Sequence, residues 1–212
     1  MARPSRDRAQ ETERVRALQD KEAPRYDRQI SFFEKLLFEG GREWVCSQAE
    51  GDVLEIAAGT GRNLPHYPEG LRLTTIELSP EMLAIAKQLA VELGHDADLR
   101  LGDAQALEFQ DVSFDAVVIT LGLCTIPDPR QAVSEAHRVL RPGGRLLEHV
   151  RSPRLPVRTV QRLLDPLAVR FAADHLVREP LEHLDAEGFE VERVERSKWG
   201  IVERVAARKS HQ

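Results

Sequence analysis

The sequence has few cysteines and no long apolar run. Its two cysteines, Cys46 and Cys124, lie far apart and form no CxxC pair. This spacing excludes a disulfide framework and a cysteine zinc site, and it is typical of a reducing compartment. No apolar segment approaches the roughly 18 residues that a membrane-spanning helix requires, and the charged N-terminal residues lack the apolar centre of a secretory signal. We therefore expect a cytoplasmic protein.

The sequence also has fewer basic than acidic residues. The 30 lysines and arginines are outnumbered by 35 aspartates and glutamates, which gives a formal net charge of −5. Such a chain has no overall cationic field to attract phosphates, so we expect no nucleic-acid partner. The length of 212 residues fits one domain and demands no second one.

From Asp52 onward, short apolar strands alternate with amphipathic helices. Strands are predicted at residues 53–56, 71–78, 99–101, 114–121, 145–150, 189–196 and 201–207, the last two at hairpin spacing. One helix is expected to follow the N-cap residue Ser79 and end at Gly94, and another to follow Asp128. This order predicts an α/β fold with a doubly wound, mostly parallel seven-strand sheet that ends in an antiparallel edge hairpin. Before the first strand, Pro24 is expected to separate two helices.

The turn after the first predicted strand carries two glycines. Gly59 and Gly61 lack a β-carbon, so they permit a sharp turn and the close approach of a ligand to the backbone. Glu77 ends the second strand, where a carboxylate accepts hydrogen bonds from ribose hydroxyls in dinucleotide sites. A nicotinamide-binding turn has a third glycine three residues after the second, but this sequence has Leu64 there. We therefore exclude a nicotinamide-dependent oxidoreductase.

Five segments at regular order and spacing carry a wider resemblance. They are VLEIAAGTGRN, TTIELS, GDAQAL, FDAVVITLGL and RVLRPGGRLL. Together they resemble the class I, Rossmann-like S-adenosylmethionine-dependent methyltransferases. This resemblance implies that the chain binds S-adenosylmethionine, releases S-adenosylhomocysteine and uses no metal. Ala57 stands where the family usually has the first glycine of its turn, a departure of one methyl group.

The resemblance also implies how the adenosine part of the cofactor is held. Glu77 corresponds to the residue that accepts both ribose hydroxyls. Asp103 corresponds to the residue that takes the adenine amino group, and the backbone N–H of Ala104 donates to the ring. Leu78 and Met82 are expected to flank the adenine.

At the methionine end, Glu55 occupies the acidic position of the family motif, near the amino group of the cofactor. Tyr26 resembles a lid residue that closes over this end. The complete predicted cofactor site comprises Tyr26, Glu55, Ala57, Gly59, Gly61, Asn63, Glu77, Leu78, Met82, Asp103, Ala104 and Thr120.

The methyl acceptor is expected beyond the carboxyl ends of the fourth and fifth strands. In-line methyl transfer mainly requires proximity, orientation and an unprotonated nucleophile. Glu148 and His149 are the candidate catalytic residues, with His149 as a general base, but neighbouring strand residues point to opposite faces and only one of them can face the acceptor. His175 is a second candidate base, and a histidine at a strand end is also commonly a structural hydrogen-bonding group. Cys124 is interpreted as pocket lining or core.

Residues 151–179 are expected to cover the acceptor. Apolar residues recur there at helical spacing around Pro166, which is expected to kink or divide the helix. The apolar residues with the histidine that continues their spacing are Val160, Leu163, Leu164, Leu167, Ala168, Phe171, Ala172 and His175, and the arginines around them are Arg151, Arg154, Arg158, Arg162 and Arg170. Such a helix covers an apolar acceptor, lies on an anionic membrane surface, or packs on the sheet as an ordinary amphipathic helix.

A closer resemblance extends over residues 53–209. VITLGLCTIPDP, LLEHV, the LDP of residues 164–166, the pair Arg178-Glu179 and the segment around Trp199 resemble the alkyl thiol S-methyltransferase family, methyltransferase-like seven. This resemblance implies S-methylation of a small thiol. A thiol with a pKa of about 8.5 is partly ionised at neutral pH and needs little base catalysis. Members of that family carry an apolar N-terminal membrane anchor, whereas this chain has a charged arm.

Two other functions remain open. The core also resembles bacterial phospholipid and quinone methyltransferases, which methylate amine or carbon acceptors at a membrane surface, so peripheral membrane contact stays open. A non-catalytic S-adenosylmethionine-binding module is the other alternative. We divide the single domain into an N-terminal helical arm and lid (1–50), a cofactor-binding core (51–150), and acceptor lid helices with the C-terminal hairpin (151–212).

Overall fold

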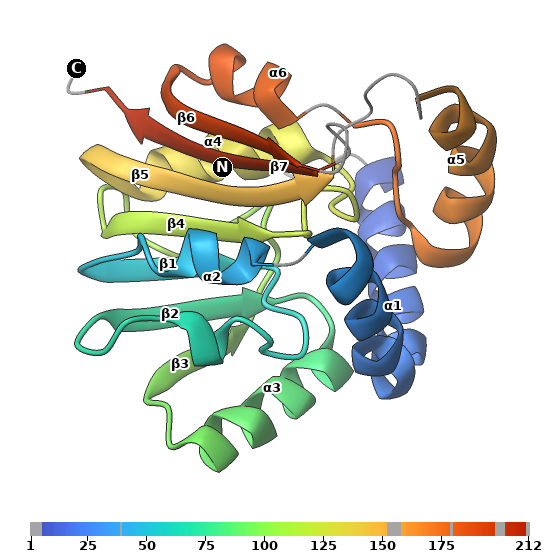
Figure 1. The fold of residues 1–212 in the computed structure, drawn as a ribbon, viewed down its shortest axis with the longest axis horizontal. Helices are drawn as coiled ribbons and strands as arrows, with labels where there is room; N and C mark the ends of the chain where they lie inside the picture. Colours follow the sequence, from blue (N-terminus) through green and yellow to red (C-terminus); the bar gives the residue numbers. More distant parts are fainter. Residues whose placement is uncertain (1–5, 39, 152–157, 179, 198–201, 211–212) are drawn as a thin grey trace.

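A computed structural model of the protein describes residues 6–38, 40–151, 158–178, 180–197 and 202–210. Seven strands form one sheet in the order β3-β2-β1-β4-β5-β7-β6 (Figure 1). Their bounds are β1 Asp52–Ile56, β2 Arg72–Glu77, β3 Ala97–Leu101, β4 Phe114–Thr120, β5 Leu140–Arg151, β6 Phe189–Ser197 and β7 Val202–Lys209. The first five strands pair in parallel, and β7 runs antiparallel to both β5 and β6. The predicted mostly parallel sheet with a C-terminal hairpin is confirmed.

The hairpin is inserted so that its second strand, β7, lies inside the sheet and its first strand, β6, forms the edge. The apolar run Val205–Ala206–Ala207 is completely buried, as expected for a strand that is paired on both sides. β6 instead alternates apolar and charged residues in the sequence FEVERVERS. Charged side chains are a common protection of an edge strand against further pairing.

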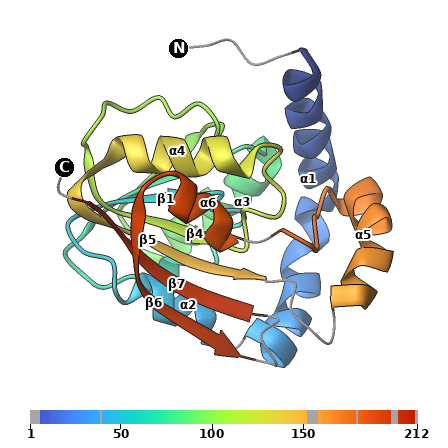
Figure 2. The same cartoon turned by 90° about the horizontal axis from the view of Figure 1, so that it is seen from above.

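Helices cover both faces of the sheet (Figures 1 and 2). Helices α2 (Gly41–Cys46) and α3 (Pro80–Leu93), with the 3₁₀ turn η2 (Leu64–His66), pack on one face, and α4 (Pro129–Val139) and α6 (Pro180–Ala186) pack on the other. Ser79 caps α3 by accepting the N–H of Met82 at 3.1 Å, and Gly94 ends it with a φ of 63°. Asp128 caps α4 by accepting the N–H of Gln131 at 3.0 Å. The predicted starts of α3 and α4 and the predicted end of α3 are therefore confirmed.

Two longer helices lie beyond the carboxyl ends of the parallel strands. Figures 1 and 2 both show α1 (Arg6–Phe33) and α5 (Arg158–Ala172) side by side at this end, and the π-helical turn η1 (Glu34–Phe38) follows α1. The predicted break at Pro24 is wrong, because α1 continues through it. A proline removes one helical hydrogen bond, and here polar contacts on both sides of Pro24 hold α1 against the core. Pro166 likewise does not divide α5.

The fifth strand is longer than predicted. It begins at Leu140 and includes Pro142-Gly143-Gly144, which the sequence suggested as a turn before the strand. The pairing of β4 with β5 shifts register between Phe114 and Ala116, so the glycines form an irregularity within the sheet. Within the described residues, no helix combines the length and the apolarity needed to cross a bilayer.

Candidate active site

Helix α1 crosses the ends of the central strands and holds the loops below it through polar contacts along its whole length. Five side chains of α1 and η1 form hydrogen bonds or ion pairs with side chains of these loops. The pairs are Arg8–Asp128, Thr12–Gln105, Asp20–Ser79, Asp27–Thr60 and Glu34–Arg62. Each partner belongs to a loop or helix start at the carboxyl end of the sheet, where open α/β folds bind their ligands. The N-terminal arm is therefore one wall of the candidate site.

A pocket lies between α1 and the loops after β1, β2, β3 and β4. Its lining residues are Val15, Gln19, Ala57, Ile76, Glu77, Leu78, Gly102, Asp103, Ala104, Thr125, Ile126 and Pro127. Five predicted cofactor residues, at positions 57, 77, 78, 103 and 104, thus lie together in one concave site. Met82 is placed differently: it is buried in the first turn of α3, where its N–H binds the capping hydroxyl of Ser79, and it does not line this pocket.

Glu77 is the buried carboxylate of this pocket. Its Oε2 accepts the N–H of Gly59 at 2.8 Å and its Oε1 accepts the N–H of Ser79 at 2.9 Å. Burial raises the pKa of Glu77, and the backbone donors oppose this effect. Each carboxylate oxygen retains further acceptor capacity. The side chain is therefore oriented and able to accept ribose hydroxyls.

The glycine turn has the backbone geometry that close ligand approach requires. Gly59 and Gly61 have φ angles of 60° and 83°, in the left-handed region. A β-carbon on Gly59 would have only Tyr26 near it, with Cε1 at 3.9 Å, whereas one on Gly61 would press on Ala86 of α3 at 3.1 Å. Ala57 also has a positive φ, of 57°. The alanine therefore differs from the usual glycine in backbone strain as well as in size.

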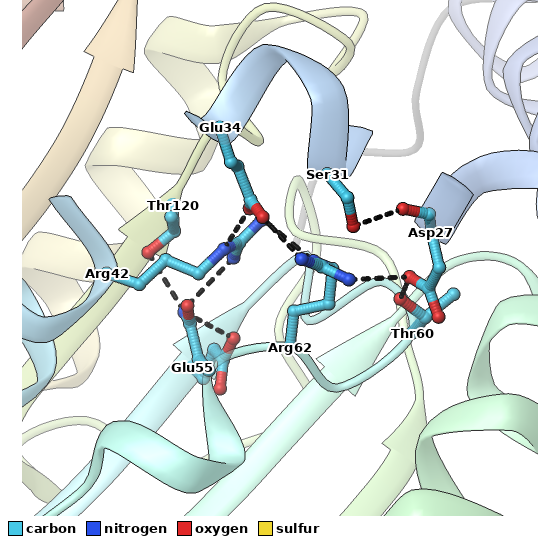
Figure 3. Close-up of polar contacts among 9 residues, drawn as sticks. Asp27, Ser31, Glu34, Arg42, Glu55, Thr60, Arg62 and Thr120 are labelled. Atoms are coloured by element: carbon cyan, nitrogen blue, oxygen red, sulfur yellow. Dashed lines mark hydrogen bonds and ion pairs between the residues drawn. The ribbon is translucent and has the colours of Figure 1, made fainter. Parts of the chain in front are cut away.

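Glu55 lies in a buried polar cluster at the end of β1 (Figure 3). Its carboxylate accepts the Asn63 amide at 2.8 Å and the Tyr67 hydroxyl at 3.0 Å. The same Asn63 amide nitrogen also donates to the Thr120 hydroxyl at 2.9 Å. The amide oxygen of Asn63 accepts a hydrogen bond from Arg42 at 2.8 Å. Burial raises the pKa of Glu55 to about 7, against the opposing effects of Tyr67, Arg42 and Asn63. Asn63 and Thr120 thus orient Glu55 beneath the glycine turn.

A carboxylate of η1 joins this cluster to the N-terminal arm. Figure 3 shows Glu34 between Arg42 and Arg62, bound to both guanidinium groups. Burial favours a higher pKa for Glu34, but the hydrogen bonds and charges of the two arginines outweigh it, so the pKa is lowered. Arg62 also approaches Asp27 of α1 at 3.5 Å, and Asp27 accepts the Thr60 hydroxyl at 2.6 Å. We call these five residues the latch, because they fasten α1 and η1 to the glycine turn.

The two predicted catalytic residues are enclosed in the fold. His149 is completely buried, packs edge-on against Phe38 and leaves no room for a β-carbon at Gly41. Burial, with the positive charges of Arg42 and Arg204, lowers its pKa to about 3. Neither this geometry nor this pKa suits a general base that meets an acceptor at neutral pH. Its catalytic role stays a prediction that this conformation does not support.

Glu148 points to the opposite face of β5, as the strand alternation predicts. It is completely buried, and its two oxygens accept no hydrogen bond from any described residue. Burial and the nearby carboxylate of Glu203 raise its pKa to about 8. Neither Glu148 nor His149 lines the pocket beside α1, and neither lines a second pocket at the ends of β4 and β5.

A second pocket lies at the ends of β4 and β5, where the acceptor was expected. Four apolar residues, Leu121, Leu123, Pro129 and Val150, line it together with Cys124, His175, Arg178 and His183. Leu121 adopts a positive φ of 54°, as Ala57 of the first pocket adopts one of 57°, so each pocket contains one residue with a strained backbone. Cys124 is pocket lining, as predicted. His175, the weaker of the two candidate bases in the sequence, is the one that the structure places here.

Two residues of the closer family resemblance shape this pocket. Arg178 donates to the carbonyls of Leu123, Ile126 and Pro127, so it fixes the loop after β4. Asp165 accepts the N–H of Leu176 at 2.7 Å and fixes the turn after α5. Glu179, Trp199 and Arg154 lie outside the described residues.

The sequence reasoning missed several polar residues of the site. They are Asp20, Asp27, Glu34, Arg42, Thr60, Arg62 and Tyr67. Those of the N-terminal arm belong to a charge-rich segment whose pattern is typical of a solvated helix, so only the tertiary contacts distinguish them. In the part of the chain that the structure describes, no three His, Cys, Asp or Glu side chains are arranged to hold a metal ion.

Comparisons with known proteins agree with this geometry. Residues 54–148 match the family described as "Methyltransferase domain". The chain is 38% identical over 118 residues to a phosphatidylethanolamine N-methyltransferase of Cereibacter sphaeroides, a match that covers 54% of this chain and 58% of the relative. It is 39% identical over 111 residues to the ubiquinone/menaquinone biosynthesis C-methyltransferase UbiE of Dinoroseobacter shibae, covering 50% and 44%. It is 33% identical over 135 residues to human thiol S-methyltransferase TMT1B, covering 61% and 55%. The matches thus span about half the length of these relatives.

Solved structures share the fold over most of the chain. A Thermotoga maritima protein described as an SAM-dependent methyltransferase superposes with a TM-score of 0.73 at 20% identity, over 92% of this chain and 99% of that chain. The [4+2]-cyclase SpnF superposes with a TM-score of 0.67 at 21% identity, over 81% and 79%. The name of the second protein shows that this fold also serves other chemistry. Residues 54–148 thus match a methyltransferase domain, and the fold that contains them is the Rossmann-like fold of S-adenosylmethionine-dependent methyltransferases.

Proposed function

We propose that the chain transfers a methyl group from S-adenosylmethionine to the sulfur of a small apolar thiol. The observation that carries the choice of acceptor is the lining of the pocket at the ends of β4 and β5. Four of its eight residues are apolar, three are the basic side chains His175, Arg178 and His183, and none is acidic. This lining suits an apolar body with an anionic or ionisable head.

The residues of the first pocket fit the cofactor. In this proposal Glu77 offers its oriented carboxylate to the ribose, and Asp103 and Ala104 of the same pocket take the adenine edge. Gly59 leaves its backbone open to the ligand. When bound, S-adenosylmethionine supplies an electrophilic methyl group on a sulfonium sulfur. Glu55 would lie beneath the methionine end, where a carboxylate favours the amino group of the cofactor.

The basic lining of the second pocket favours a thiol over an amine. A guanidinium such as that of Arg178 near a thiol lowers the pKa of the thiol and increases the thiolate fraction, which is the nucleophile. The same positive charge opposes the binding of an ammonium group. Burial and the charge of Arg178 lower the pKa of His175, so this imidazole is neutral at neutral pH and able to accept the thiol proton. In this proposal His175, rather than His149, receives that proton.

The relatives support this proposal and also define its rivals. Thiol S-methyltransferase TMT1B carries the proposed activity in its name, whereas the other two curated relatives are named for phospholipid N-methylation and quinone C-methylation. A phospholipid or quinone acceptor at a membrane surface is therefore the second candidate. A non-catalytic cofactor-binding module is the third.

The test is a methyl-transfer assay with alkyl and aryl thiols, an aminolipid, a catechol and a quinone precursor. Release of S-adenosylhomocysteine and the mass of the product are measured. We expect turnover on the thiols. His175→Asn should lower kcat at pH 6 more than at pH 9, because thiols ionise without a base at high pH. His66→Asn is the matched control, since burial also lowers the pKa of His66, but this residue is on the surface in η2.

Turnover on the lipid or quinone alone would overturn the thiol proposal in favour of the second candidate. Cofactor binding by calorimetry with no turnover on any acceptor would favour the binding module. Equal effects of His175→Asn at both pH values would remove His175 from the proton transfer while leaving the acceptor class intact.

A further inference from the structure

Helix α5 turns its apolar stripe away from the protein. Val160, Leu163, Leu164 and Leu167 follow i, i+3, i+4, i+7 spacing and are 56%, 73%, 49% and 55% exposed. The opposite side of the helix contains Arg158, Gln161, Asp165, Ala168 and Val169, all half-buried. A surface helix of a globular protein normally shows the reverse arrangement, with its apolar stripe against the core.

Specific contacts fix this orientation. Asp165 accepts the N–H of Leu176, and Arg14 of α1 donates to the carbonyl of Val169 at 2.5 Å. Rotation of α5 to bury its leucines would break both contacts. Of the three alternatives for this segment, packing of its apolar stripe on the sheet is therefore contradicted, and the stripe is available to a partner.

The charge of α5 indicates an anionic partner. Arg162 and Arg170 are exposed, and the only acidic residue in the helix sequence is Asp165, which lies on the protein-facing side. Arg170, seven residues after Leu163, lies at one margin of the stripe, and Arg162 is exposed farther round the same side of the helix. An apolar stripe with exposed arginines beside it, on a helix lying at the surface, is the pattern of a segment that lies in the interface of an anionic bilayer.

The area of the stripe argues against a second copy of the chain. Stable protein interfaces bury about 800 Å² on each partner, and four partly exposed side chains on a 15-residue helix offer much less. Two copies of α5 packed on each other would also bring their exposed arginines together. A bilayer imposes neither requirement, because each side chain inserts individually.

We propose that α5 docks the protein on an anionic lipid bilayer. Figures 1 and 2 show α5 at the end of the molecule where the candidate site lies, on the outer side of α1. His175, three residues beyond the end of α5, lines the second pocket. Docking therefore brings that pocket close to the membrane surface, where apolar acceptors concentrate. Only this last consequence rests on the proposed function, since docking requires no methyl transfer.

The experiment is flotation of the purified full chain with vesicles of phosphatidylcholine, alone or mixed with phosphatidylglycerol. We expect the wild-type chain to float with the mixed vesicles. The double variant Leu163→Ser, Leu167→Ser should lower the ratio of bound to free protein at least tenfold. Val91→Ser is the matched control, because Val91 is an 82% exposed apolar residue on α3, and it should float as the wild type does.

The charge is tested separately. Arg162→Gln should weaken flotation with the mixed vesicles severalfold and leave binding to pure phosphatidylcholine unchanged, whereas Lys87→Gln, at an exposed position of α3, should change neither. Circular dichroism and a thermal melt establish that the variants fold. Failure of the wild type to float, equal flotation of the double variant, or a dimer in sedimentation that the double variant abolishes would overturn the proposal. None of these outcomes depends on the acceptor assay.

Discussion

Each half of the sheet contains a buried glutamate, and the two glutamates differ in the hydrogen-bond donors around them. On the cofactor side, the carboxylate of Glu77 accepts two backbone N–H groups from Gly59 and Ser79. On the acceptor side, Glu148 accepts none from the described residues and lies near Glu203. One carboxylate is held ready for a ligand, whereas the other favours its neutral form.

The helices that pack on the sheet also differ from α5. The apolar residues of α3 and α4 face inward, and Ala132, Val133, Ala136 and Val139 of α4 are completely buried. The leucines of α5 face outward, although their spacing is just as regular. Helices α3 and α4 thus bury their apolar residues against the sheet, whereas α5, next to the acceptor pocket, leaves its apolar stripe exposed.

The helix contrast predicts the largest effect. Val133→Asp buries an unpaired charge under α4 and should lower the free energy of unfolding by about 4 kcal/mol or more. Leu163→Asp on α5 should change it by less than about 0.5 kcal/mol, because the side chain is exposed. Urea unfolding followed by circular dichroism measures both. A large loss in the Leu163 variant would mean that α5 packs inward in solution.

The buried Glu148 without donors predicts a dependence of stability on pH. The pKa of Glu148 is about 8 in the folded chain and about 4.3 in an unfolded one. The folded state therefore binds the extra proton, and stability falls as pH rises between these values. Glu148→Gln should remove about 2–4 kcal/mol of this fall between pH 5 and pH 9. The exposed Glu190→Gln is the control, and parallel pH profiles for wild type and Glu148→Gln would contradict the assignment.

Removal of the other glutamate tests the ligand site. Glu77→Ala should weaken S-adenosylmethionine binding at least tenfold, about 1.4 kcal/mol, because the ribose hydroxyls lose their acceptor. Titration calorimetry measures the affinity. Glu81→Ala, at an exposed position in the first turn of α3, should bind S-adenosylmethionine as the wild type does. Unchanged affinity in Glu77→Ala would refute the ribose assignment.

The smallest predicted effect concerns the latch. Glu34→Gln removes the charge that holds Arg42 and Arg62, which is worth about 1 kcal/mol in a partly exposed pair. We expect S-adenosylhomocysteine to dissociate about fivefold faster from this variant, as measured by stopped flow. The exposed Glu43→Gln on α2 serves as the reference. Identical dissociation rates would mean that the arm does not close the cofactor site.

Much of the cofactor half could be predicted because its signals are local. The Ser79 cap, the Gly94 stop and the Gly59–Gly61 turn each act within a few residues, and the structure has all three as expected. Ala57 is the exception: the sequence indicated a small difference in size, whereas its positive φ adds strain that depends on how the turn is closed.

The acceptor half could not be predicted as well, because its decisive contacts join distant segments. His149 looked like a base from its place at a strand end, but packing of Phe38 and Gly41 against it encloses the ring. His175 lines the second pocket because Asp165 holds the turn after α5 and because the backbone N–H of His175 donates to the Cys124 carbonyl. No spacing in the sequence records these contacts.

The sequence by itself determined the alternation of strands and helices from Asp52 onward, the caps of α3 and α4, and the turn that marks the ligand end of the sheet. These features depend on backbone conformations and hydrogen bonds within a few residues. The tertiary structure decided that α1 continues through Pro24, that α5 turns its leucines outward, and which buried glutamate has donors. Each of these depends on the free energy of contacts between segments far apart in the chain, which outweighs local preference.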